Sequence, residues 1–92
     1  MTATELATDL SSFGYVGEVK HYAVSPAAGY GDDLTWGHVI VQARTDTPAA
    51  GAFIWPADEA GTVVNPVPLP GSISGETATI AQALTAAGYT IA

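Results

Sequence analysis

Two groups of side chains have types and spacing that are suited to chemistry, and the first is an acidic loop. Tyr30-Gly31-Asp32-Asp33 places two neighbouring carboxylates in one short segment. Carboxylate oxygens are the ligands that Ca²⁺ and Mg²⁺ prefer, but Asp32 and Asp33 have no further ligands at a recognisable spacing. Glycine and aspartate are also the residues that tight turns favour. The sequence therefore predicts a turn between two strands and no metal cofactor at this position.

The same four residues resemble the Y-G-D-D motif of RNA-dependent polymerases, in which a hairpin turn presents aspartates to Mg²⁺. That resemblance implies a metal-dependent transfer reaction. Those enzymes also need carboxylates on separate motifs and a basic channel several times the size of this chain. The remainder of the sequence supplies neither feature, so a polymerase is not predicted.

The second group is a pair of histidines on neighbouring predicted strands. If Ser25 pairs with Leu34, His21 lies opposite His38, whereas a slip of one residue moves the two rings to opposite faces of the sheet. A metal site would need a third ligand, and a catalytic pair would need a nucleophile and a pocket that excludes water. The motifs G-x-S-x-G, H-E-x-x-H and Walker A are absent. Two half-buried or interface histidines are the favoured interpretation, and an enzyme or ligand site at this pair is the less favoured alternative.

Charge excludes one large class of partners. Two basic residues, Lys20 and Arg44, face nine acidic ones, so that the formal net charge is −7. Proteins that bind nucleic acid or anionic membranes draw much of their affinity from clustered Lys and Arg. We therefore expect no nucleic-acid partner and no membrane partner.

Composition indicates one small folded domain spanning residues 1–92. The apolar share is 48%, which argues against disorder, and no apolar run approaches the roughly 20 residues of a membrane span. Cysteine is absent, which fits a cytoplasmic protein, and no signal peptide is recognisable. Abundant Ala, Gly and Thr with a single Lys and a single Asn are typical of GC-rich bacterial or phage genomes.

Periodicity predicts two helices. Thr2-Ala3-Thr4-Glu5 has the form of a capping box, and apolar residues then recur at helical spacing up to Gly14, which predicts a helix over 3–13. A second helix is expected to begin at the N-cap Ser74, with Glu76 in its first turn, and to end at Gly88. Its apolar face comprises Thr77, Ile80, Ala81, Leu84 and Ala87.

The strands are expected between these helices, at 15–25, 34–44 and 50–55, with a short strand at 89–91. A further short strand is indicated at 62–64, and the proline-rich segment 65–72 is interpreted as an extended crossover. The order α-β-β-β-α-β predicts a two-layer α+β sandwich, with an antiparallel sheet and both helices on one face.

The face without helices is the main functional indication. If Arg44 pairs with Ala50, apolar side chains occupy both faces of the central hairpin, whereas a one-sided sheet should be polar on its free face. An apolar free face marks an interface, unless the segment 65–71 covers it. The predicted interface residues are Tyr22, Trp36, His38, Ile40, Phe53 and Trp55.

The favoured function is a non-enzymatic protein–protein interaction or assembly protein that binds a protein partner or itself. Its size and composition suit a phage-encoded protein, either in the virion or bound to a host factor in the host cytoplasm. The alternative is an acidic inhibitor or antitoxin-like module that blocks a basic partner with Asp32, Asp33, Asp58 and Glu59. Leu69-Pro70-Gly71 and Ser74-Gly75-Glu76-Thr77 resemble a segment of HicB-type antitoxins, although the predicted first helix departs from that pattern.

Overall fold

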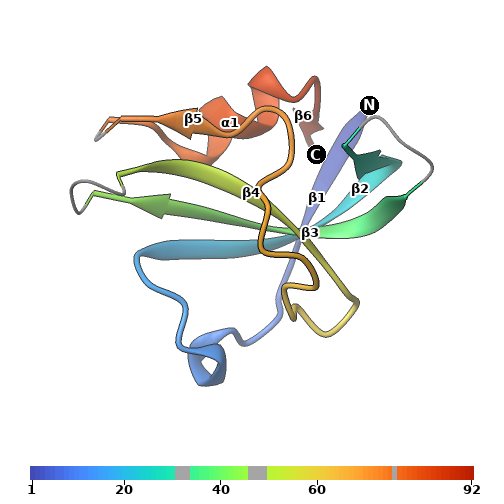
Figure 1. Ribbon diagram of the computed structural model, residues 1–92. Helices are drawn as coiled ribbons and strands as arrows, with labels where there is room; N and C mark the ends of the chain where they lie inside the picture. Colours follow the sequence, from blue (N-terminus) through green and yellow to red (C-terminus); the bar gives the residue numbers. More distant parts are fainter. Residues whose placement is uncertain (31–33, 46–49, 76) are drawn as a thin grey trace.

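The computed structural model describes residues 1–30, 34–45, 50–75 and 77–92 (Figure 1). These residues form six strands, one 3₁₀ helix (η1) and one α-helix. In chain order the elements are β1 (Thr2–Leu6), η1 (Ser11–Phe13), β2 (Glu18–Gly29), β3 (Thr35–Arg44), β4 (Gly51–Ala57), β5 (Ile73–Ser74), α1 (Ile80–Ala86) and β6 (Thr90–Ile91).

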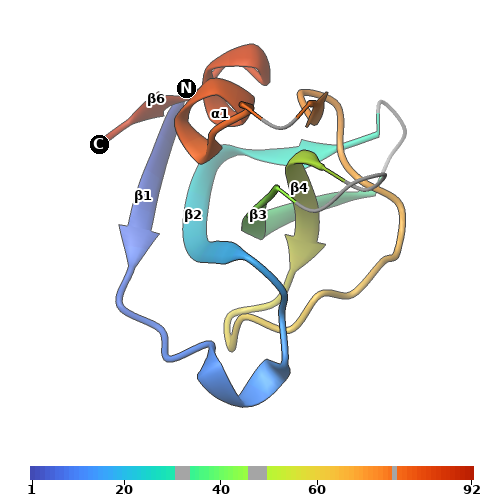
Figure 2. The same ribbon diagram turned by 90° about the vertical axis from the view of Figure 1, so that its left-hand side faces the viewer.

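All six strands belong to one curled sheet in the order β5-β4-β3-β2-β1-β6. Neighbouring strands are antiparallel except β1 and β6, which are parallel. The sheet bends into half a barrel, with α1 on one side and η1 on the other (Figure 2). The predicted two-layer sandwich with two helices is therefore wrong, because the described residues contain a single short α-helix beside a mixed sheet.

The first predicted helix is the main error. Thr2–Leu6 is a strand that pairs along its whole length with β2 and also pairs with β6. Only Ala3 is buried within it, and the carboxylate of Glu5 lies 3.4 Å from Lys20 Nζ instead of capping a helix. An isolated helix of this length is marginal in water, so pairing with two strands outweighs the helical spacing of the apolar residues. Gly14 does end η1 in the left-handed conformation, at φ 74°.

The second helix exists but begins later than expected. Its N-cap is Thr79, which forms a reciprocal capping box with Gln82, whereas Ser74 belongs to β5 and pairs with Gly51. Glu76 lies outside the described residues. The predicted end at Gly88 is confirmed, because this glycine has φ 93° and follows the last turn. The buried side chains of α1 are Ile80, Ala83 and Leu84.

The helix packs on one face of the sheet and forms the core there. Leu84 is fully buried and Ile80 is 5% exposed, and full burial of such a side chain contributes about 1.5–3 kcal/mol. The crossover runs along the edge of β4, where the Leu69 N–H donates to the Ile54 carbonyl at 2.7 Å. The core cluster comprises Ala3, Tyr22, Val24, Val39, Val41, Ala52, Ile54, Leu69, Ile80, Ala83, Leu84 and Tyr89.

The central hairpin is confirmed, but its register differs from the predicted one by one residue. Arg44 pairs with Gly51 instead of Ala50, so Ile40 lies opposite Trp55. Side chains of directly paired residues point to the same face of a sheet. Consequently Ile40 and Trp55 share the face turned away from the core cluster, which we call the distal face.

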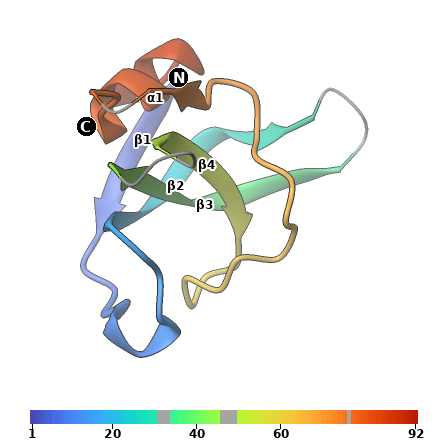
Figure 3. The same cartoon turned by 60° about the vertical axis from the view of Figure 1, so that its left-hand side comes forward.

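The far parts of β2 and β3 project from the sheet as a hairpin (Figure 3). Between Ala23 and Ala28 the register with β3 shifts, so that several residues of β2 lie opposite the single β3 residue Gly37. This irregularity bends the two strands away from the sheet body. Within the described residues, no helix combines the length and the apolar character needed to cross a lipid bilayer.

Candidate functional site

The distal face contains a groove of about 260 Å³. β3 and β4 form its floor, and the segments that follow η1 and β4 form its walls. The floor residue Ile40 is fully buried, whereas Trp55 is half-buried and bounds the open space. The lining residues, which together define the groove, are Tyr15, Ile40, Gln42, Trp55, Val63 and Pro66.

The polar atoms around the groove are bonded within the chain. The Trp55 indole N–H donates to Gln42 Oε1 at 3.2 Å, and Gln42 Nε2 donates to the Val16 carbonyl at 2.6 Å. The Tyr15 hydroxyl donates to the Gly61 carbonyl at 2.8 Å and accepts the Val63 N–H at 3.0 Å. These bonds use the main polar side chains of the lining, so the groove presents apolar surface to a ligand.

Exposed apolar residues extend the groove outward. The ring of Phe13 stacks on Tyr15 with centroids 5.4 Å apart, and Phe53 lies beside Trp55 at 5.9 Å. Val16 and Val64 are 54% and 48% exposed in the two wall segments. These apolar side chains adjoin the lining residues Tyr15 and Trp55 or follow a lining residue in the wall segments.

The two histidines meet beside the groove, on the same distal face. His21 pairs with Ile40, and His38 pairs with Ala23, so the rings are diagonal neighbours instead of directly opposed. His21 Nε2 lies 3.1 Å from His38 Nδ1, and His21 Nδ1 lies 2.8 Å from Thr8 Oγ1. One nitrogen of the close pair must carry a proton and the other must accept it, because two N–H groups or two lone pairs would repel.

Burial favours the neutral form of His21. The side chain is 1% exposed, and this burial lowers the pKa of His21, with a further contribution from His38. The carbonyl and the charge of Asp58 act in the opposite direction. Thr8, His21 and His38 form a row of one hydroxyl and two imidazoles. A nucleophile, its general base and the group that orients the base follow one another in the same order. However, Thr8, His21 and His38 are not among the residues that line the groove.

The structure separates the predicted interface residues into three groups. His38, Ile40, Phe53 and Trp55 lie together on the distal face. Tyr22 is 2% exposed in the core cluster beneath the helix. Trp36 lies in the projecting hairpin, where it packs against the core cluster and meets Tyr30 edge to face at 5.5 Å.

The predicted acidic patch is described only in part. Asp32 and Asp33 lie outside the described residues. Asp58 and Glu59 are exposed in the turn that follows β4. Asp58 also shapes this turn, because its Oδ1 accepts the N–H groups of Ala60 and Thr62 at 3.0 and 2.9 Å. Among the described residues, no group of three or more His, Asp or Glu side chains is arranged to hold a metal ion.

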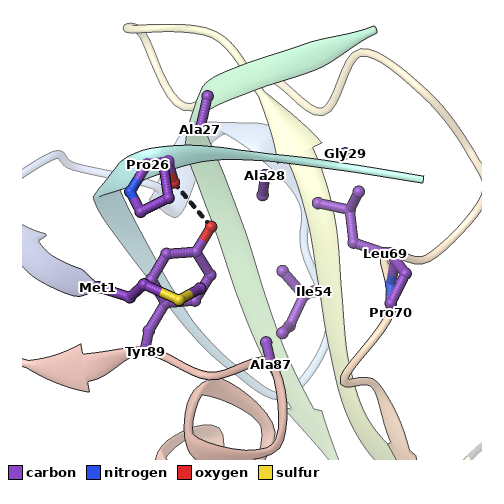
Figure 4. A pocket seen from close by; sticks show the side chains of 10 residues that line it. All are labelled: Met1, Pro26, Ala27, Ala28, Gly29, Ile54, Leu69, Pro70, Ala87 and Tyr89. Carbon is purple, nitrogen blue, oxygen red and sulfur yellow. Dashed lines mark hydrogen bonds between the residues drawn. The ribbon is translucent and has the colours of Figure 1, made fainter. Parts of the chain in front are cut away.

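A smaller cavity of about 160 Å³ lies on the helix side of the sheet (Figure 4). The Tyr89 hydroxyl donates to the Pro26 carbonyl at 2.8 Å across its wall, which ties the segment after α1 to β2. None of the predicted interface residues lines it. The lining residues are Met1, Pro26, Ala27, Ala28, Gly29, Ile54, Leu69, Pro70, Ala87 and Tyr89.

Sequence reasoning missed four groove residues, namely Tyr15, Gln42, Val63 and Pro66. Tyr15 and Val63 are 48 positions apart in sequence and meet through one hydrogen bond, which no local pattern encodes. Gln42 did carry a signal, because it is a polar residue inside an otherwise apolar strand.

Comparisons with protein-family models, with curated proteins and with solved structures found no match.

Proposed function

We propose that this chain is a non-enzymatic protein-interaction module whose groove receives an apolar side chain of a partner protein. The observation that carries the proposal is the combination of an open apolar groove with polar atoms that are already bonded within the chain. A ligand that needs many directed hydrogen bonds gains little here. An apolar anchor gains the full benefit of leaving water.

The size of the groove supports an anchor of this kind. Sites for small molecules usually enclose about 300–1,000 Å³, and the groove of about 260 Å³ is smaller than that range. Protein interfaces concentrate their binding energy in a few side chains that fill such pockets. The contact set then becomes Trp55 and Phe53, with the Tyr15–Phe13 stack as the opposite wall.

The non-enzymatic part of the proposal rests on the histidines. The residue best placed to act as a base, His21, is 1% exposed and bonded on both ring nitrogens. Its pKa is lowered by burial, and neither His21 nor His38 is among the residues that line the groove. The pair therefore lies beside the groove and is not part of its lining.

Peptide display tests the proposal. A library of random 12-residue peptides is selected on the wild-type chain, and each enriched peptide is then measured against Trp55→Ala and Phe13→Ser. We expect peptides with one large apolar residue, whose affinity falls about tenfold or more in Trp55→Ala. Ile91→Ser is the matched control, because Ile91 is apolar and 41% exposed but lies in β6.

Phe13→Ser covers the risk that Trp55→Ala unfolds the chain, since Phe13 lies outside the sheet and is 37% exposed. Enriched peptides that bind both groove variants as tightly as they bind the wild type would contradict the proposal. Binding that is weakened by Ile91→Ser but by neither Trp55→Ala nor Phe13→Ser would also contradict the proposal.

A second candidate function is an acidic inhibitor-like module that occupies a cationic site on another protein. The exposed carboxylates of Asp58 and Glu59 favour it, together with the net charge of −7. This alternative predicts binding that weakens steeply with salt and does not depend on Trp55.

A further inference from the structure

The charges around the groove are unevenly placed. Val63, a wall residue, forms a bridge with Ala57 at the end of β4, and the acidic turn begins at the next residue, Asp58. The same turn reaches the opposite wall, because the Gly61 carbonyl accepts the Tyr15 hydroxyl. Asp58 and the exposed Glu59 therefore stand at one end of the groove.

The two cations of the chain lie away from the acidic turn. Lys20 belongs to the helix side of the sheet, where its Nζ lies 3.4 Å from Glu5 Oε1. Arg44 is four positions beyond Ile40 in β3 and pairs with Gly51, at the end of the strand away from the acidic turn. No lysine or arginine thus neutralises the turn from within the described walls of the groove.

We infer that the partner segment carries Lys or Arg next to its apolar anchor, on the side that meets the turn 58–61. This inference rests on the proposed function and adds the chemistry of the partner. Opposite charges across an interface raise the association rate and reject wrongly charged partners. A second copy of the chain fits poorly, since each copy has a net charge of −7 and only two basic side chains.

The structure offers a matched pair of charge reversals. Glu59→Lys and Glu18→Lys change the net charge equally, and both residues are exposed. Glu59 lies in the acidic turn, whereas Glu18 opens β2 on the helix side, near Lys20 and Thr79. Neither change removes the Asp58 carboxylate that holds the turn together. A difference between the two variants therefore reports position and not total charge.

The probe is the peptide that display enriches most strongly, labelled with a fluorophore and measured by anisotropy. Dissociation constants are compared at about 0.01 M and about 1 M ionic strength, where the screening lengths are about 30 and 3 Å. We expect Glu59→Lys to weaken binding about fivefold at low salt, Glu18→Lys to weaken it less than twofold, and the difference to vanish at high salt.

The outcomes separate the inference from the function it rests on. Peptides that depend on Trp55 but lack basic residues, or that respond equally to Glu59→Lys and Glu18→Lys, would overturn the inferred partner chemistry and leave the groove as the binding site. Peptides that are insensitive to Trp55→Ala would overturn both. Basic peptides that need Trp55 and discriminate between the two charge reversals support both.

Discussion

Removing one oxygen atom from the groove wall, in the variant Tyr15→Phe, should destabilise the fold measurably. The hydroxyl donates to the Gly61 carbonyl at 2.8 Å and accepts the Val63 N–H at 3.0 Å. Phenylalanine keeps the ring and its stack on Phe13 but leaves both backbone groups without this partner. Each bond contributes about 0.5–1.5 kcal/mol net, so the loss should be about 2 kcal/mol.

The assay is thermal unfolding followed by circular dichroism, with a urea titration as a second measurement. For a chain of this length a loss of about 2 kcal/mol lowers Tm by about 10 °C. Tyr89→Phe is the matched control, because it removes the same atom but only one hydrogen bond, to the Pro26 carbonyl. We expect about half the effect in that variant.

The reasoning would be refuted if Tyr15→Phe lowered Tm by less than Tyr89→Phe did. That result would mean that the Tyr15 hydroxyl does not join the two wall segments. The hydrogen bonds of Tyr15 would then not be what holds the walls of the groove together. An unchanged urea slope is expected in both variants, since neither alters the surface exposed on unfolding.

Two further predictions concern the histidine pair and the helix cap. Because burial lowers the pKa of His21 below its ordinary value of 6.5, the unfolded chain binds more protons between the lowered pKa and 6.5. The free energy of unfolding should therefore fall as pH falls through that window. His21→Gln should flatten this part of the stability profile measured in urea, and an equal slope in both proteins would contradict the assignment. Thr79→Ala removes the capping box of α1 and should cost about 1 kcal/mol, or about 4–8 °C in Tm. Thr85→Ala, an exposed change in the same helix, should be neutral or slightly stabilising, and equal losses in the two variants would exclude a capping role.

Part of this fold was predictable because short-range chemistry decides it. The central hairpin follows from two apolar runs around a breaker segment, and both runs are strands. Gly88 ends α1 as predicted, and Gly14 ends η1 although the helix predicted over 3–13 does not form; both glycines adopt positive φ angles. The proline-rich crossover contains the core residue Leu69 and contributes no long strand.

The errors arise where distant segments decide the outcome. Residues 3–13 carry a helical apolar spacing, yet Thr2–Leu6 is held between β2 and β6, which come from residues 18–29 and 90–91. The similar pattern around Ile80 does form a helix, because its apolar side meets the sheet. The local periodicity of the two segments is therefore the same, and their tertiary contacts decide which becomes a strand and which becomes a helix.

The candidate site also combines residues placed by local sequence with residues placed by distant segments. A one-residue error in the register of β3 with β4 moves Trp55 from opposite Val39 to opposite Ile40, and so changes the face on which Trp55 is expected. His38 and Ile40 of β3 gather with Phe53 and Trp55 of β4 on the distal face, whereas Trp36, at the same alternation in β3, packs against the core cluster. Residues whose position depends on the loops, such as Tyr15 and Val63, could not be found before the loops were placed.

The central claim is that the groove on the distal face binds the apolar anchor of a partner. The most direct test uses the two tryptophans of the chain, because each indole N–H group gives one signal in a ¹H–¹⁵N NMR spectrum. Trp55 lines the groove, whereas Trp36 packs in the projecting hairpin against Tyr30. Addition of the enriched peptide should shift the Trp55 signal and leave the Trp36 signal unchanged. A bound peptide that shifts Trp36 alone, or neither signal, would contradict the claim.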